Sequence, residues 1–166
     1  MTGRIFTSDH KVYDLPALLS WNVVHTGGVP CDSYTVKFLY DKEMAAILRL
    51  ASGFMGIENG QIVARGIVDE YTVELGREGI VATITGRGAA ARLLDNESRP
   101  VTYQDATLEE IVRCHATPYG IVCRRNEGSA QPFALEISAG ASRYAALEAG
   151  AKLCGVVPYF TADGAL

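Results

Sequence analysis

The string Gly86-Arg87-Gly88-Ala89-Ala90-Ala91 comes nearest, in residue types and spacing, to a known chemistry. It has the G-x-G-x-x-A pattern with which a strand-to-helix turn binds the pyrophosphate of a dinucleotide. Such a unit also needs a helix of several turns and an acidic residue at the end of the next parallel strand, about 20 positions on. Here residues 96–100 interrupt the helix, and Asp105 precedes a helix cap. We therefore expect Gly86 and Gly88 to turn a strand sharply into a helix, and we predict no cofactor.

Acidic residues near this string could be paired for general acid-base catalysis. These residues are Asp69, Glu70, Asp95 and Glu97. Neighbouring residues of a strand point to opposite faces, which separates Asp69 from Glu70, and the other two lie where a short helix passes into a loop. We therefore expect no catalytic pair. Instead, the planar guanidinium of Arg87 should pair with Asp69, Asp95 or Glu97 and hold the strand against the helix that follows it.

The cysteines and histidines give no further catalytic or metal-binding candidate. Cys114 and His115 are neighbours on a predicted helix, about 100° apart, so they do not share a face as a nucleophile and its base would. The four cysteines are widely spread without C-x-x-C spacing, and His10 and His25 have no ligand partners at metal spacing. The sequence thus predicts no catalytic residue and no metal site, and we expect that the protein is not an enzyme.

The composition of the chain is typical of a protein that folds around an apolar core. Its 166 residues are 48% hydrophobic and 20% charged, with a formal net charge of -4. That acidic balance argues against specific nucleic-acid binding, which needs clustered lysine and arginine, although it is compatible with a passive channel for DNA. No run of about 18 apolar residues is present, and the first residues lack the apolar region of a signal peptide, so we expect neither a membrane segment nor export.

The first part of the chain, residues 1–95, predicts an antiparallel β-rich domain. Residues 33–40 are rich in β-branched and aromatic types, and residues 43–51 place apolar side chains on one helical face. Asn59-Gly60 predicts a type I′ hairpin, and a second hairpin surrounds the turn at residues 76–79. We expect this domain to close, or nearly close, into a small barrel that resembles a tail-tube domain.

The second part, residues 96–166, predicts a small α+β domain. Thr107-Leu108-Glu109-Glu110 has the pattern of a capping box. The remaining expected elements are a helix at 89–94, a connector at 96–102, strands at 121–125, 133–137 and 156–160, and a helix at 142–154. Asp163-Gly164 indicates a turn into a strand that has only begun at Leu166, so we expect the chain to be a fragment.

Several of these segments together resemble a known family. Residues 64–71, which contain Gly66, Asp69 and Glu70, and residues 84–97, which contain Gly86, Arg87, Gly88 and Asp95, are similar to two motifs of phage tail and baseplate hub proteins, the group of the late control D type. Residues 107–121 and 140–164 resemble the helix and strand modules that follow in that family. The resemblance covers about residues 60 to 166.

The resemblance implies a structural protein of the virion tail, assembled in the bacterial cytoplasm. It implies a trimeric ring whose tube-like domains continue the tail tube, with tail tube and spike proteins as partners, and neither a cofactor nor chemistry of its own. It assigns a structural role to the motif residues, which are Asp69, Glu70, Gly86, Arg87, Gly88 and Asp95. Family members commonly continue into a second tube-like domain, and we expect this fragment to end before it.

Two alternatives remain open at this point. Residues 129–166 resemble in outline the LysM-like modules that bind cell-wall glycans, a function that would require an exposed aromatic groove. A tail-associated peptidoglycan hydrolase would require a glutamate in a cleft or a Cys-His pair on facing elements.

Overall fold

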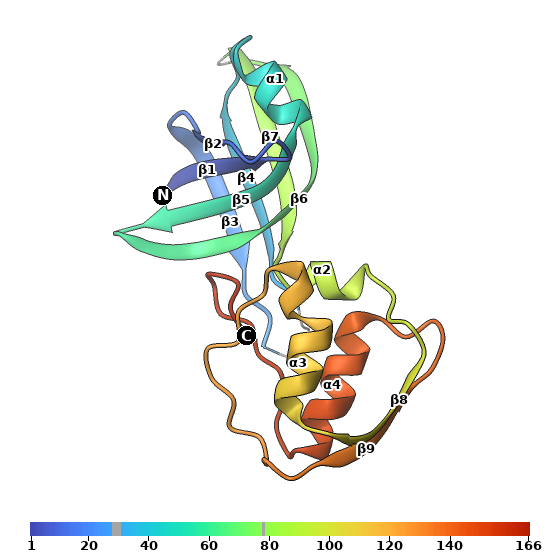
Figure 1. Cartoon of the computed structure of the whole chain (residues 1–166). Coiled ribbons are helices and arrows are strands. Elements are labelled where there is room, and N and C mark those ends of the chain that lie inside the picture. Colours follow the sequence, from blue (N-terminus) through green and yellow to red (C-terminus); the bar gives the residue numbers. More distant parts are fainter. Residues whose placement is uncertain (28–30, 78) are drawn as a thin grey trace. The chain divides into compact units, whose positions relative to one another are not determined.

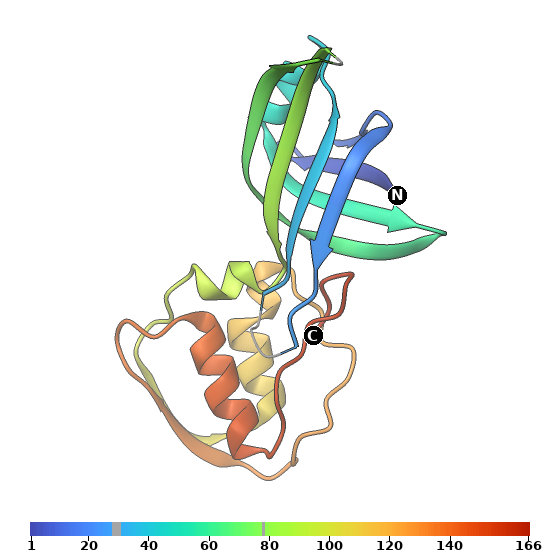
Figure 2. The ribbon, with the colours of Figure 1, turned by 180° about the vertical axis from the view of Figure 1, so that it is seen from behind.

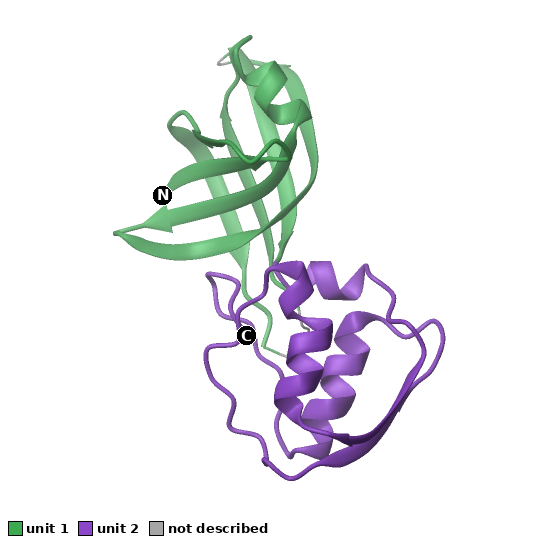
Figure 3. Cartoon of the chain, in the orientation of Figure 1, with its two compact units in different colours: residues 1–88 green, residues 89–166 purple. Residues whose placement is uncertain are grey.

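The computed structural model describes residues 1–27, 31–77 and 79–166, which form two compact units, residues 1–88 and 89–166 (Figure 3). The second unit takes in α2 (Ala91–Leu94), which the sequence placed at the end of the first domain. The reason is packing, because Leu93 is fully buried in the core of the second unit. Glu78, in the predicted turn at residues 76–79, lies outside the described residues.

The first unit is one seven-stranded sheet with a short helix. Its elements are β1 (Thr2–Thr7), β2 (Val12–Asp14), β3 (Leu18–Val24), β4 (Ser33–Leu39), α1 (Met44–Arg49), β5 (Ala51–Glu58), β6 (Gln61–Gly76) and β7 (Gly79–Gly88). The strand order is β2-β1-β5-β6-β7-β4-β3, and every pairing is antiparallel. The predicted antiparallel, β-rich character is therefore confirmed.

The long strand β6 divides this sheet into two layers. Its first part pairs with β5, and from Gly66 onward it pairs with β7. As a result β1 and β5 cross over the layer of β3, β4 and β7, as two opposite views show (Figures 1 and 2). Alternate residues of β4 point between the layers, and their apolar side chains Tyr34, Val36 and Phe38 are buried there with Phe54 of β5.

The β5–β6 hairpin turns at Asn59-Gly60 as predicted. Both residues have positive φ angles, 51° and 77°, which a type I′ turn requires. Asparagine and glycine tolerate that backbone region better than other residues. The turn therefore fixes the register in which Glu58 meets Gln61.

The expected barrel is not closed. In the described part of this unit the sheet ends at β2 on one side and at β3 on the other, and these two strands do not pair with each other. In addition, residues 70–76 of β6 pair on one side only, with β7, among the residues that the structure describes. The first unit thus has open strand edges, a feature that a closed barrel would have removed.

The second unit packs two helices beside a two-stranded antiparallel sheet (Figure 1). After α2 it contains β8 (Val101–Ala106), α3 (Leu108–His115), the 3-10 turn η1 (Thr117–Tyr119), β9 (Phe133–Ile137) and α4 (Arg143–Leu153). The capping residue predicted at Thr107 is confirmed, since its hydroxyl accepts from the Glu110 amide at 3.3 Å. Ser142 caps α4 in the same way, at 3.0 Å from the Ala145 amide.

Three expected elements of the second unit are wrong. Residues 121–125 and 156–160 belong to no helix or strand. The first of these segments makes two backbone hydrogen bonds with Leu166. The amide of Leu166 donates to the carbonyl of Val122, and the carbonyl of Leu166 accepts from the amide of Arg124. The predicted connector at 96–102 ends early, because pairing with β9 draws Val101 and Thr102 into β8. Whether a segment joins a sheet depends on the strands that lie beside it, and the residues of the segment alone do not show which strands those are.

Candidate functional site

Gly86 and Gly88 both lie within β7 and do not end it in a left-handed turn. Neither residue has a positive φ angle, but β7 ends at Gly88 and, after a turn at residues 89–90, α2 begins at Ala91, so the expected passage from strand to helix does follow Gly88. Gly86 is required for a different reason. A Cβ atom at this position would lie 2.1 Å from the carbonyl oxygen of Ile67 and 2.2 Å from the hydroxyl oxygen of Tyr34. At Gly88 the nearest atoms would be those of Asp32, at 3.4 Å, an ordinary contact.

Tyr34 occupies the space that the missing side chain of Gly86 leaves. Its hydroxyl donates to the carbonyl of Ile67 at 2.6 Å, and its ring stacks on Phe54 with a centroid separation of 4.6 Å. Burial, with a smaller contribution from the Asp69 charge, raises the pKa of this hydroxyl above its usual value, so it remains a donor. The residue ties β4, β5 and β6 together at one point.

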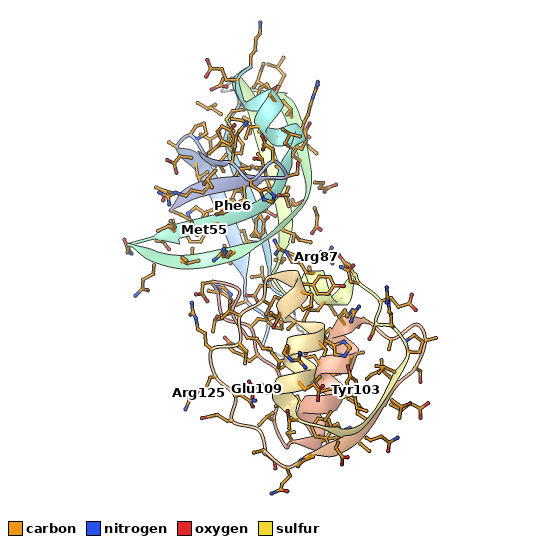
Figure 4. All side chains as sticks on the ribbon, viewed as in Figure 1. Phe6, Met55, Arg87, Tyr103, Glu109 and Arg125 are labelled. Carbon is orange, nitrogen blue, oxygen red and sulfur yellow. The ribbon has the colours of Figure 1, made fainter. Side chains whose placement is uncertain are left out.

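A β-bulge next to this point positions Asp69. Val68 pairs with Gly86 and Glu70 with Thr85, so Asp69 is the extra residue of β6. Its carboxylate accepts two hydrogen bonds from Arg87, from Nε at 2.9 Å and from Nη2 at 2.8 Å (Arg87 is labelled in Figure 4). Glu70 accepts from the Thr85 hydroxyl at 3.3 Å.

Arg87 thus forms an ion pair with Asp69, one of the three carboxylates named from the sequence. It joins two neighbouring strands, β6 and β7, beside the bulge. The side chains of Arg87 and Asp69 are 37% and 32% exposed, so the pair contributes little more than a surface ion pair does. Asp95 is exposed at the end of α2, in the second unit.

These residues do not form a nucleotide or metal site. The helix after the glycines, α2, is one turn of 4 residues, too short for the helix N-terminus that binds a pyrophosphate. Within the described parts of the chain, no group of three or more His, Cys, Asp or Glu side chains could hold a metal ion. None of the described helices is long and apolar enough to cross a membrane.

The open edges β3 and β6 are the feature of the first unit that sequence reasoning did not specify. On β3, Trp21 and Val23 pair with Val36 and Tyr34 and so share the face that points to the core. On β6, Tyr71, Val73 and Leu75 pair with Ile84, Ala82 and Ile80 and lie on that same face. Trp21 is nevertheless 41% exposed, Val73 40% and Leu75 85%, because each stands at an edge.

The opposite face of the same four strands is polar. It carries Ser20, Asn22, Thr35, Lys37, Glu70, Thr72, Glu74, Thr83 and Thr85. Hydroxyl and amide groups predominate there; the charged side chains are Lys37, Arg87, Glu70 and Glu74, and Val24, Leu39 and Val81 are apolar. This layer therefore has one apolar face that needs covering and one polar face that suits water.

The second unit has an open apolar hollow of about 410 Å³. Its walls come from α3, α4 and the extended segments near residues 123–127 and 156–161, and its lining includes Leu108, Val112 and Leu147. Tyr159 is the one aromatic side chain among the residues that line this hollow. Glu127 at the rim pairs with Arg125, labelled in Figure 4, at 2.6 Å.

Comparison with known proteins gives a consistent result. Residues 90–166 match the family model described as the second domain of the gp44-like baseplate hub proteins. A 43 kDa tail protein of prophage MuSo2 from Shewanella oneidensis shares the fold with a TM-score of 0.75 and 20% identity, over 99% of this chain and 53% of that one. A tail protein from Neisseria meningitidis MC58 does so with a TM-score of 0.72 and 18% identity, over 98% and 49%. No curated protein sequence matches the chain.

The chain thus spans about half the length of these two tail proteins. The predicted resemblance to phage tail and baseplate hub proteins is confirmed by the family match and by both structures. The match of sequence lies in the second unit, whereas the likeness of fold extends over both.

Proposed function

We propose that this chain is a structural component of the baseplate hub of a phage or prophage tail, of the late control D type, and that it helps to join the tail tube to the central spike. The observation that carries the proposal is the layer of β3, β4, β7 and β6, which ends in two open edges with apolar side chains on one face. The family match in the second unit supports the same assignment.

The two edges are suited to pair with each other between subunits. Three antiparallel steps separate β3 from β6 in the layer, so these strands run in opposite directions. A rotation about an axis parallel to the strands keeps the direction of each strand. The β3 of a neighbouring subunit related by such a rotation therefore lies antiparallel to this subunit's β6. Such head-to-tail pairing continues the sheet and closes into a ring, for which we propose three subunits in the intact protein.

Pairing of these edges would also cover exposed apolar surface. Trp21 and Val23 on one edge and Tyr71, Val73 and Leu75 on the other lie on the same face of the layer. Across a subunit contact they would become cross-strand neighbours, and aromatic and β-branched residues make favourable cross-strand pairs. Without a partner they remain partly in water, which is unfavourable for side chains of this size.

The polar face supports a passive channel within such a ring. On this face Lys37 and Arg87 offset Glu70 and Glu74, so no cluster of positive charge forms there. A wall of hydroxyl groups without clustered positive charge gives phosphates little to bind. DNA could therefore pass along it without being held.

Immunogold labelling of the phage or prophage tails that carry this chain tests the proposal. We expect gold particles at the baseplate end of the tail, where the tube meets the spike. Labelling of the head, of the length of the tail, or of no part of the particle would contradict the assignment to the hub. Digestion of cell-wall sacculi by the same purified chain would instead support the hydrolase alternative.

A further inference from the structure

A buried histidine at the end of α3 has polar side chains within hydrogen-bond distance of both ring nitrogens. The side chain of His115 is 1% exposed. Its Nδ1 lies 3.4 Å from Nη1 of Arg143 and 3.4 Å from the hydroxyl of Ser98, and its Nε2 lies 3.1 Å from the hydroxyl of Tyr103, labelled in Figure 4. Because a guanidinium can only donate, Nδ1 accepts and the ring is neutral with its proton on Nε2.

No carboxylate contacts this ring or Arg143 among the residues that the structure describes. Tyr103 of β8 stands near Cys114 and Glu110 of α3, and Glu110 pairs with Arg113 at 3.4 Å. The ring of Tyr119, from η1, lies 5.8 Å from the Arg143 guanidinium carbon. The Nε atom of Arg143 is buried and has no hydrogen-bond partner within the described ranges of the chain. A second positive charge at His115 would therefore face a guanidinium with no anion to compensate it.

His115 connects α3 to a small paired segment that we call the clasp, defined as residues 96–98 and 141–143. The Ser98 amide donates to the Ala141 carbonyl at 2.7 Å, and the Arg143 amide to the Asn96 carbonyl at 2.8 Å. Both clasp side chains that reach α3, those of Ser98 and Arg143, point to the same Nδ1 atom. The clasp also holds the beginning of α4, which starts at Arg143.

We propose that His115 is a proton-operated latch that holds the clasp on α3 when neutral and releases it when protonated. Proton uptake at Nδ1 replaces the acceptor of the Arg143 hydrogen bond by a donor and places two cations in contact. The ring cannot relieve this by turning, because Tyr103 occupies the other nitrogen. The start of α4 and the turn at residues 96–98 then separate from α3, while the remaining apolar core of the unit stays packed.

The direction of the pH dependence follows from the surroundings of the ring. Burial, and then the Arg143 charge, lower the pKa of His115 below its ordinary value of 6.5. The released form, with the ring in water, binds protons more readily than the latched form. The latch is therefore fully closed above pH 6.5 and opens as the pH falls. Between pH 6.5 and the lowered pKa of His115, the fraction of molecules with an open latch rises about tenfold for each pH unit.

Nuclear magnetic resonance of the whole chain tests the latch. Amide exchange at Ser98 and Arg143, corrected for the intrinsic effect of pH, should rise with the pH dependence given above, while the amides of β4 and β7 keep their protection. In the variant His115→Asn an amide oxygen takes the place of Nδ1, so this pH dependence should disappear. His10→Asn is the matched control, since His10 is exposed and has a φ of 63° that asparagine tolerates, and it should behave like the unmodified chain.

Retention of the pH dependence in His115→Asn, or its absence in the unmodified chain down to the pH of global unfolding, would overturn the proposal. A second variant keeps the test valid if His115→Asn does not fold. Replacement of Arg143 by glutamine removes the neighbouring cation, so the ring of His115 should titrate at a higher pH than in the unmodified chain. An unchanged titration midpoint would show that Arg143 and His115 are not coupled.

Discussion

The hydroxyl of Tyr34 lies where a side chain at position 86 would have to be, because a Cβ on Gly86 would stand 2.2 Å from that oxygen. The carbonyl of Ile67 closes the same space from the other side, at 2.1 Å. Glycine is therefore required here by the close approach of β4 and β6 to β7, and not by an unusual backbone angle.

Substitution of the two glycines of the G-R-G string by alanine should have unequal effects. Gly86→Ala must displace both Tyr34 and the backbone of β6, so we expect the free energy of unfolding to fall by about 3 kcal/mol or more. Gly88→Ala introduces an ordinary contact and should change it by less than about 1 kcal/mol. Urea denaturation of both variants measures the difference. Equal losses would contradict the close-approach explanation.

The pairing of Asp69 with Arg87 should be measurable in a double-mutant cycle with Asp69→Asn and Arg87→Gln. The two-bond geometry predicts a coupling energy of about 0.5 to 1 kcal/mol, since both side chains are partly exposed. Arg4 and Asp14 are the matched control, because they also join neighbouring strands but are 47% and 78% exposed. A coupling no larger than that of the control pair would show that the second hydrogen bond adds nothing.

Nucleotides should not bind at the G-R-G string. Both glycines lie inside a paired strand, and the one-turn α2 offers no anion site. Titration of NAD and of ATP into the chain should give no binding heat in calorimetry. Micromolar binding that Gly88→Ala abolishes would contradict this assignment.

Local signals in the sequence predicted the features that depend on neighbouring residues. The Asn59-Gly60 turn and the Thr107 cap are examples, since each depends on residues at most a few positions apart. Features that depend on distant partners were not predictable. Val101 joins β8 only because β9 lies beside it, and Asp69 becomes a bulge only in the register of β6 with β7. The sequence indicated that Gly86 and Arg87 were structural, but not the contacts that make them so.

The open edges were the hardest feature to infer. Trp21 and Val73 alternate with polar neighbours as residues of any half-buried strand do. Only the strand order shows that both stand at an edge, with one face turned to the core and one side unpaired. The pattern therefore predicted strands, the family resemblance implied a ring, and the topology supplied the two strands through which we propose that a ring forms.

A mixing experiment with two edge variants tests the ring most directly. Trp21→Lys blocks the β3 edge and Val73→Lys blocks the β6 edge, because each places a charge among the apolar side chains of the proposed contact. Leu39→Lys is the control, since Leu39 is 44% exposed but lies on β4, which is paired on both sides. Light scattering gives the mass of each variant, measured over the widest concentration range that its solubility allows.

We expect the unmodified chain and Leu39→Lys to associate as concentration rises, toward three times the subunit mass of 17.8 kDa. Each edge variant alone should remain monomeric. A mixture of Trp21→Lys and Val73→Lys retains one intact contact between the two, so it should form a dimer and nothing larger. Monomers in the mixture, association of either edge variant alone, or an unmodified chain that stays monomeric at every concentration would contradict head-to-tail assembly through β3 and β6.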